Sequence, residues 1–139
     1  KRAFSLLFSL KAPYFRTVRP QVREVRQPHA ELTIRKRWGV QNHIGTVHAI
    51  ALCNLAEFVG GLACDASIPP SMRWIPKGMT VAYLKKAIGS MRATATPAFA
   101  PRESAQGYEL PFEVVVANAQ GEPVFTATIA MWVSPKTPR

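Results

Sequence analysis

Alternation of apolar and polar positions predicts most of the regular structure in this chain. Residues 30–35 (AELTIR) alternate between apolar and polar with a period of two. They lie in a strand expected over residues 21–37, which Pro28 could interrupt. Four further strand-like runs follow toward the C-terminus: residues 77–86, 89–98, 108–118 and 123–133. Runs this close in sequence pair most readily as antiparallel hairpins.

Residues 47–66 (VHAIALCNLAEFVGGLACDA) follow a different pattern. Only Glu57 and Asp65 carry a formal charge there, and the Ala- and Leu-rich composition without proline favours a helix. A helix that is apolar on all sides is buried on all sides, so we expect a sheet wrapped around it. Pro69-Pro70 ends the helix.

The order of these elements predicts an α+β fold in which a long central helix is wrapped by an antiparallel five-stranded sheet. We expect a short N-terminal helix and lead-in over residues 1–19, the main domain over 20–134 and a tail over 135–139. The first apolar stretch is short and lacks a cleavage site, so an amphipathic helix is preferred there over a signal peptide.

Composition limits the classes of function. The chain has 139 residues and is 47% apolar, which excludes wholesale disorder, and no apolar run is expected to span a membrane. Lys and Arg number 18 against 8 acidic residues, a net charge of +10 that favours anionic partners. Cys53 and Cys64 would lie about 16 Å apart on one helix, too far for a disulfide, which suggests a reducing, cytoplasmic location.

Glu57 is the most informative residue of the helix. A buried ionised carboxylate costs several kcal/mol unless it is partnered. Cys53, Asn54, Gly60 and Gly61 stand three or four residues away and share its face. Two glycines weaken a helix, so we expect something to approach this face closely. The alternative is a structural acid held by an arginine or a backbone amide.

The segment before the helix, Asn42 to His48, offers a second group of candidates. Thr46 is a plausible N-cap and Gly45 allows a tight turn. The unpaired amides of the first helical turn could hold a carbonyl oxygen as it becomes an oxyanion, and Asn42 could add a donor. Asn42 is otherwise an ordinary turn residue, and His48 a satisfied core histidine.

The length of the helix restricts how these groups can act together. Thr46 and Glu57 are separated by about 16 Å along the axis, so they cannot reach one substrate from the same helix. Two antiparallel helices related by a twofold axis would bring the Glu57 of one beside the start of the other. We therefore expect a homodimer, or a dimer of dimers, with two equivalent sites.

These residues resemble the hotdog-fold acyl-CoA thioesterases, in particular the phenylacetyl-CoA thioesterase-like proteins and a related, mostly uncharacterised hotdog family. Their pattern is an Asn, a Gly-Thr-x-His-Gly-Gly turn and an acid nine residues after the His. Here Asn42, Gly45-Thr46-Val47-His48 and Glu57 match it, while Ala49-Ile50 stands where the family has Gly-Gly.

The resemblance implies a role for each residue. Asn42 and the backbone amide of Ala49 would polarise the thioester carbonyl, beside His48 in the turn. Glu57 from the partner subunit would attack that carbonyl or activate a water. Around them, Gly45, Thr46, Asn54, Gly60, Gly61 and Tyr83 are expected to line the substrate site. No cofactor or metal is expected, coenzyme A being part of the substrate.

The basic excess fits a coenzyme A ligand, whose phosphates could dock on Lys85, Lys86, Arg92 and Arg102, although a solvated face is the favoured interpretation of these residues. The N-terminal basic run, which includes Arg23 and Arg35, is interpreted as solvent-facing. Two other functions stay open: a non-catalytic acyl-CoA binding module, and nucleic-acid binding, which is weakened by the absence of a basic-aromatic motif. Neither the acyl group nor the choice between coenzyme A and an acyl carrier protein follows from the sequence.

Overall fold

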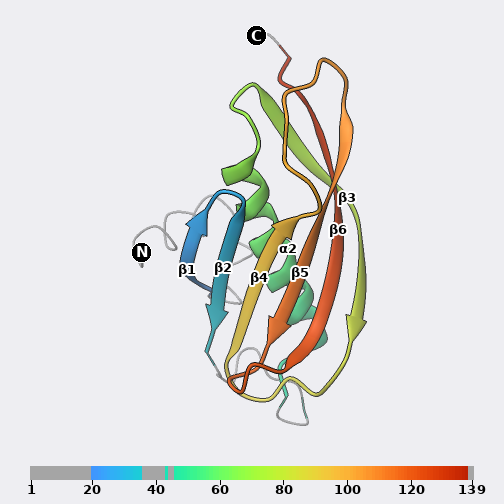
Figure 1. The fold of residues 1–139 in the computed structure, drawn as a ribbon. Helices are drawn as coiled ribbons and strands as arrows, with labels where there is room; N and C mark the ends of the chain where they lie inside the picture. The colour runs from blue at the N-terminus through green and yellow to red at the C-terminus, as the bar shows by residue number, and fades with distance from the viewer. Residues whose placement is uncertain (1–19, 36–42, 44–45, 138–139) are drawn as a thin grey trace.

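The computed structural model describes residues 20–35, 43 and 46–137, and within them one helix packs on a six-stranded antiparallel sheet (Figure 1). The order across the sheet is β1-β2-β4-β5-β6-β3. The elements are β1 (Gln21–Arg26), β2 (His29–Ile34), α2 (Ala49–Ser67), β3 (Met72–Tyr83), β4 (Met91–Pro97), β5 (Tyr108–Ala117) and β6 (Pro123–Pro135). The α+β class is as predicted, and the short helix expected within residues 1–19 lies outside the described residues.

The sheet has six strands rather than the expected five because the first predicted strand is a hairpin. β1 and β2 pair antiparallel, with Arg26 opposite His29, and the chain turns at Gln27 and Pro28. Proline has no N–H to donate to a strand ladder and its φ is fixed, so it favours the turn over a continuous strand.

β3 begins and ends earlier than the run predicted over 77–86. Its first residues pair with the end of β6, and a register shift between Pro76 and Gly78 carries the ladder past the proline. This bulge lets one strand continue across a Pro-Lys-Gly segment whose sequence interrupts the apolar alternation.

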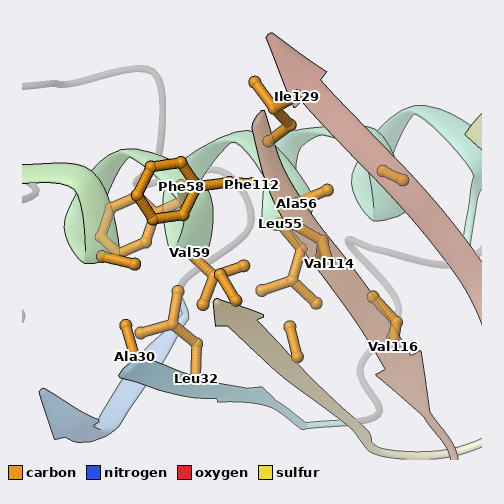
Figure 2. Packing of buried hydrophobic residues seen from close by; sticks show 14 of the residues in the cluster. Ala30, Leu32, Leu55, Ala56, Phe58, Val59, Phe112, Val114, Val116 and Ile129 are labelled. Carbon is orange, nitrogen blue, oxygen red and sulfur yellow. The ribbon is translucent and has the colours of Figure 1, made fainter. Parts of the chain in front are cut away.

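The core lies between the sheet and one side of α2. Figure 2 shows Leu55, Phe58 and Val59 of the helix packed among apolar residues of β2 and β5. Leu32 and Phe112 are fully buried, whereas Glu31 and Glu113 beside them in sequence point to the other face. The alternation in the sequence therefore separates the covered face of the sheet from its outer face.

The helix is not buried all round, contrary to the expectation. Ile50 and Glu57 are exposed in the single chain, because the sheet covers only one side of α2. By length and composition alone α2 could cross a membrane, which corrects the expectation that no run would qualify. The helix packs against the sheet and most of its apolar stretch, 61%, is buried, as in the core helix of a folded domain.

Candidate functional site

The start of α2 is built by His48 rather than by the predicted cap Thr46. His48 is the N-cap, and its Nδ1 accepts a hydrogen bond from the Ile50 N–H at 3.0 Å. Since Nδ1 is the acceptor, the neutral imidazole carries its proton on Nε2. Thr46 is instead buried, and Val47 donates its N–H to Ala87 O at 2.7 Å.

The helix start leaves a backbone donor accessible. Ala49 is exposed, and its N–H has no partner among the described residues. An amide of the first helical turn has no acceptor within its own helix, and it lies at the positive end of the helix dipole. His48 is also exposed, so it is not the core histidine of the alternative interpretation. Asn42 and Gly45 lie outside the described residues.

Glu57 lies on the exposed side of the middle of α2. Within the described part of the chain it makes no hydrogen bond and no ion pair, so the structural-acid alternative finds no arginine or amide to hold it. Its carboxylate is exposed in the single chain, which corrects the expectation of a buried acid. Asn54, one turn earlier, is half-buried on the same side.

The edge strand β3 contacts this side of α2 at two points. Trp74 packs against Gly61 and donates its Nε1–H to Asp65 Oδ1 at 3.2 Å. Tyr83 Oη lies 3.3 Å from Cys53 Sγ and its ring packs on Phe125. The hydrogen bond with Cys53 raises the pKa of the Tyr83 phenol.

Between these contacts the strand and the helix do not cover each other. From Cys53 to Gly61 the helix advances about 12 Å, while β3 advances about 30 Å from Trp74 to Tyr83. The middle of the strand therefore cannot follow the helix. Met79, which shares the inner face of the sheet with its neighbour Ile129, stays 37% exposed.

We call the resulting surface the open face; it comprises Ile50 and Glu57 of α2, Met79 and Tyr83 of β3, and Leu84 and Ile88 in the loop that follows β3. The five apolar members belong to the small set of large apolar side chains that are exposed in the described residues. A concentration of this kind marks a surface that binds a partner or a ligand. The open face thus combines one carboxylate with five exposed apolar side chains from α2, β3 and the loop after β3.

The two glycines near Glu57 have a packing explanation. A Cβ on Gly60 would stand 2.6 Å from Cδ1 of Ile129, and one on Gly61 would stand 2.9 Å from Cη2 of Trp74. Something does approach the helix closely, as the sequence indicated, but it is the sheet of the same chain. No ligand is needed to explain why these positions are glycine.

The predicted phosphate-binding residues do not form one group. Lys85 lies in the loop after β3 and pairs with Glu122 at 2.5 Å, and this lowers the pKa of that carboxyl. Arg102 stacks on Tyr108, 4.4 Å from the ring centroid. Arg92 pairs with Glu31 on the outer face of the sheet. Lys86 is exposed in the same loop as Lys85.

One group of possible metal donors appears that the sequence did not indicate. Ligand atoms of Glu24, His29 and Glu31 lie within 4.8 Å of one another on the β1–β2 hairpin. Arg26 already pairs with Glu24 at 3.0 Å, and Arg92 with Glu31 at 3.3 Å. Both carboxylates therefore have cationic partners. The β1–β2 hairpin lies at the opposite end of the sheet from β3, so the group is remote from the open face.

The chain matches one protein family and is similar to several solved structures. Residues 1–133 match the family model described as a domain of unknown function, DUF4442. None of the curated proteins matches the sequence. A crystal structure described as genomics APC5556 is 46% identical, with a TM-score of 0.86 over 98% of this chain and 91% of that one.

Two more distant structures carry a description of activity. PA5026 from Pseudomonas aeruginosa, a protein of unknown function and probable thioesterase, is 23% identical, with a TM-score of 0.80 over 94% of this chain and 92% of that one. The thioesterase HI1161 from Haemophilus influenzae is 14% identical, with a TM-score of 0.75 over 88% of this chain and 82% of that one. At these identities the likeness shows a shared fold.

Proposed function

This chain belongs to the DUF4442 family and has the hotdog fold of thioesterases, and from its open face we propose that it hydrolyses an acyl thioester at a site shared by two subunits. The observation that carries the proposal is Glu57, an exposed carboxylate in the middle of an otherwise largely buried helix, without a hydrogen bond or ion pair among the described residues. No structural partner accounts for an acid on this apolar helix, which makes Glu57 the candidate general base or nucleophile.

The separation along α2 supports a site made by two copies. His48 and Glu57 are nine residues apart, or about 14 Å along the axis, so one helix cannot place both groups on one carbonyl. A twofold axis through the open face would bring Glu57 of one subunit to the Ala49 amide of the other. It would also cover the exposed apolar side chains of both.

The edge strand β3 supports the same dimer. It is 12 residues long and lies at the end of the sheet, and Ile75 on its outer side is 54% exposed. A long apolar edge strand leaves backbone groups unpaired and invites pairing with another strand. Pairing of β3 with its copy would satisfy those groups and continue the sheet through the dimer.

The chemistry follows from the placement of charge. With Glu57 as general base, its carboxylate takes a proton from a water whose oxygen attacks the thioester carbonyl carbon. The Ala49 N–H, with Asn42, holds the oxyanion until the C–S bond breaks, and the thiolate leaves with the proton. With Glu57 as nucleophile, an acyl-carboxylate anhydride forms first, the thiolate leaves, and water then hydrolyses the anhydride.

Non-catalytic binding of an acyl thioester is the second candidate. Ile50 follows the amide that would hold the carbonyl and is 60% exposed, where the thioesterases that this chain resembles have glycine. A bulky side chain there narrows the approach to the amide. In that case the protein would bind acyl thioesters without consuming them.

A chain-length series of acyl-CoA substrates tests the proposal. Hydrolysis is followed by the loss of thioester ultraviolet absorbance, because a thiol reagent would also react with Cys53. Glu57→Gln should lower kcat by about 100-fold or more, the range for loss of a general base. Asp65→Asn, an acid on the same helix that accepts from Trp74, should retain activity. Binding without turnover by the wild type supports the second candidate, and equal turnover by Glu57→Gln rejects the assigned role.

A further inference from the structure

A pocket on the outer face of the sheet gathers three arginines. It has a volume of about 400 Å³ and receives Arg23 from β1, Arg35 from just after β2 and Arg92 from β4. None of the described residues that line it is acidic. Three guanidinium groups around one hollow repel each other, and an anion between them would relieve that repulsion.

Strand register explains how the pocket forms. Thr33 on β2 stands opposite Arg92 on β4, and Arg92 stands opposite Ala117 on β5. Directly opposed residues share a face of the sheet, so these three make one row across its outer side. Thr33 and Ala117 line the pocket together with Arg92, and their small side chains leave room beside the longer arginines.

The arginines keep donors for a ligand. Arg23 donates from Nε to Thr33 Oγ1 at 2.9 Å, and Arg92 from Nε to Glu31 at 3.3 Å. Both contacts use Nε and leave the terminal NH₂ groups for another acceptor. Arg35 has no hydrogen bond or ion pair within the described part of the chain. Glu31 offsets one of the three charges, so the pocket stays net positive.

The pocket lies at the end of the sheet where α2 begins. The Val47 N–H bonds to Ala87 O, in the loop that leads from β3 into the strand of Arg92. Figure 1 shows the start of α2 and the start of β4 at the same end of the fold. If the acyl end of a ligand occupies the start of α2, the other end of that ligand would therefore lie near the arginine pocket.

We propose that Arg23, Arg35 and Arg92 form a binding site for phosphate groups. Guanidinium forks match phosphate oxygens in geometry and charge. The source of these phosphates is the nucleotide end of coenzyme A. That assignment rests on the proposed function, whereas phosphate binding by the pocket does not. The site includes Arg92 but not Lys85 or Arg102, which interact with Glu122 and Tyr108 instead. Its other two members, Arg23 and Arg35, belong to the N-terminal basic run.

Calorimetric titration with adenosine 3′,5′-bisphosphate in phosphate-free buffer tests the pocket. Arg23→Gln, Arg35→Gln and Arg92→Gln should each weaken binding by about tenfold, as expected for one charge-assisted hydrogen bond, and affinity should fall with salt. Arg73→Gln removes the same charge at the opposite edge of the sheet and should bind like the wild type. No saturable binding by the wild type, or unchanged binding by the triple variant, overturns the site.

Competition identifies the source of the phosphate. If coenzyme A displaces the bisphosphate and dephospho-coenzyme A does so at least about tenfold less well, the pocket holds the carrier. If inorganic pyrophosphate binds through the same arginines and coenzyme A does not displace it, the phosphate site stands and its assignment to the carrier is overturned. Glu57→Gln should bind the bisphosphate like the wild type. Phosphate binding can therefore be measured independently of whether the protein hydrolyses thioesters.

Discussion

Trp74 of the edge strand covers Gly61 of the helix, and this contact fixes one end of β3 on α2. A Cβ on the glycine would stand 2.9 Å from Cη2 of the indole, whose Nε1–H is held by Asp65 at 3.2 Å. The indole is therefore restrained by packing at one end and by a hydrogen bond at the other. The open face begins where this contact stops.

Gly61→Ala should destabilise the fold because the restrained indole cannot move away without losing its bond to Asp65. We expect a net loss of about 1–2 kcal/mol in the free energy of unfolding, overpacking exceeding the gain in helix propensity. Gly60→Ala is the matched control, since its Cβ would clash with the terminal methyl of Ile129, which can rotate away, and would otherwise make only ordinary contacts of 3.7 Å or more. Urea unfolding followed by circular dichroism measures both. An equal or larger loss for Gly60→Ala would contradict this account.

Alkylation should distinguish the two cysteines and report on the open face. Cys53 is half-buried one turn before Glu57, whereas Cys64 is fully buried, and burial raises the pKa of the Cys64 thiol to about 12. N-ethylmaleimide should therefore add once per folded chain, at Cys53, and stop thioester hydrolysis by filling the site.

Mass spectrometry and the hydrolysis assay check this prediction together. Cys53→Ala should keep its activity and become resistant to the reagent. Modification of Cys53 in the wild type with activity intact would place the reaction away from the open face.

The buried thiol of Cys64 gives stability a pH dependence. Below pH 9 the thiol is protonated in both states, so its contribution to stability is fully present. Between pH 9 and about 12 the unfolded chain releases this proton and the folded chain retains it. Unfolding is then favoured by rising pH, by about 1.4 kcal/mol per unit.

Chemical unfolding at pH 8, 9, 10 and 10.5 measures this slope. Cys64→Ala should be less stable at pH 8 because it leaves a cavity, but it should lose stability less steeply above pH 9. Parallel curves for the two proteins would show that the thiol is not responsible.

Charge on the edge strand should prevent dimer formation. Ile75→Lys with Met79→Lys places two cations on opposite sides of β3, and a twofold axis along this edge would bring each cation near its copy in the partner subunit. We expect a monomer by light scattering, with thioester hydrolysis lost because the site is divided. Val115→Lys, on an apolar residue of β5 that is as exposed as Met79, should leave that dimer intact. A dimeric double variant would exclude β3 from the interface.

Much of the fold could be predicted from local pattern. The alternation over residues 30–35 and 108–116 assigned side chains to the inner or outer face, because successive residues of a strand point to opposite sides, whereas the bulge in β3 breaks this rule. The turn at Asn118 was also predictable. Its Oδ1 accepts the N–H groups of Gln120 and Glu122, and Gly121 adopts a φ of +80°. Pro28 indicated a break that the structure realises as a hairpin.

The candidate site was only partly predictable. The spacing from His48 to Glu57 identified the acid and the helix start, because a helix converts residue separation into a fixed distance. The sequence did not indicate that Met79 would remain exposed beside the helix or that Tyr83 would bond to Cys53. Those relations depend on how far β3 departs from α2, and pairing with β6 sets that path.

Local sequence pattern was enough to predict the class of fold, the central helix, the free thiols and the acid in the middle of the helix, since these follow from periodicity, composition and spacing along one element. Tertiary structure decided which side of the helix stays open, what the two glycines contact, and that Arg23, Arg35 and Arg92 meet. Contacts between distant segments depend on strand order and register, which the sum of the core packing fixes and no local run of residues encodes.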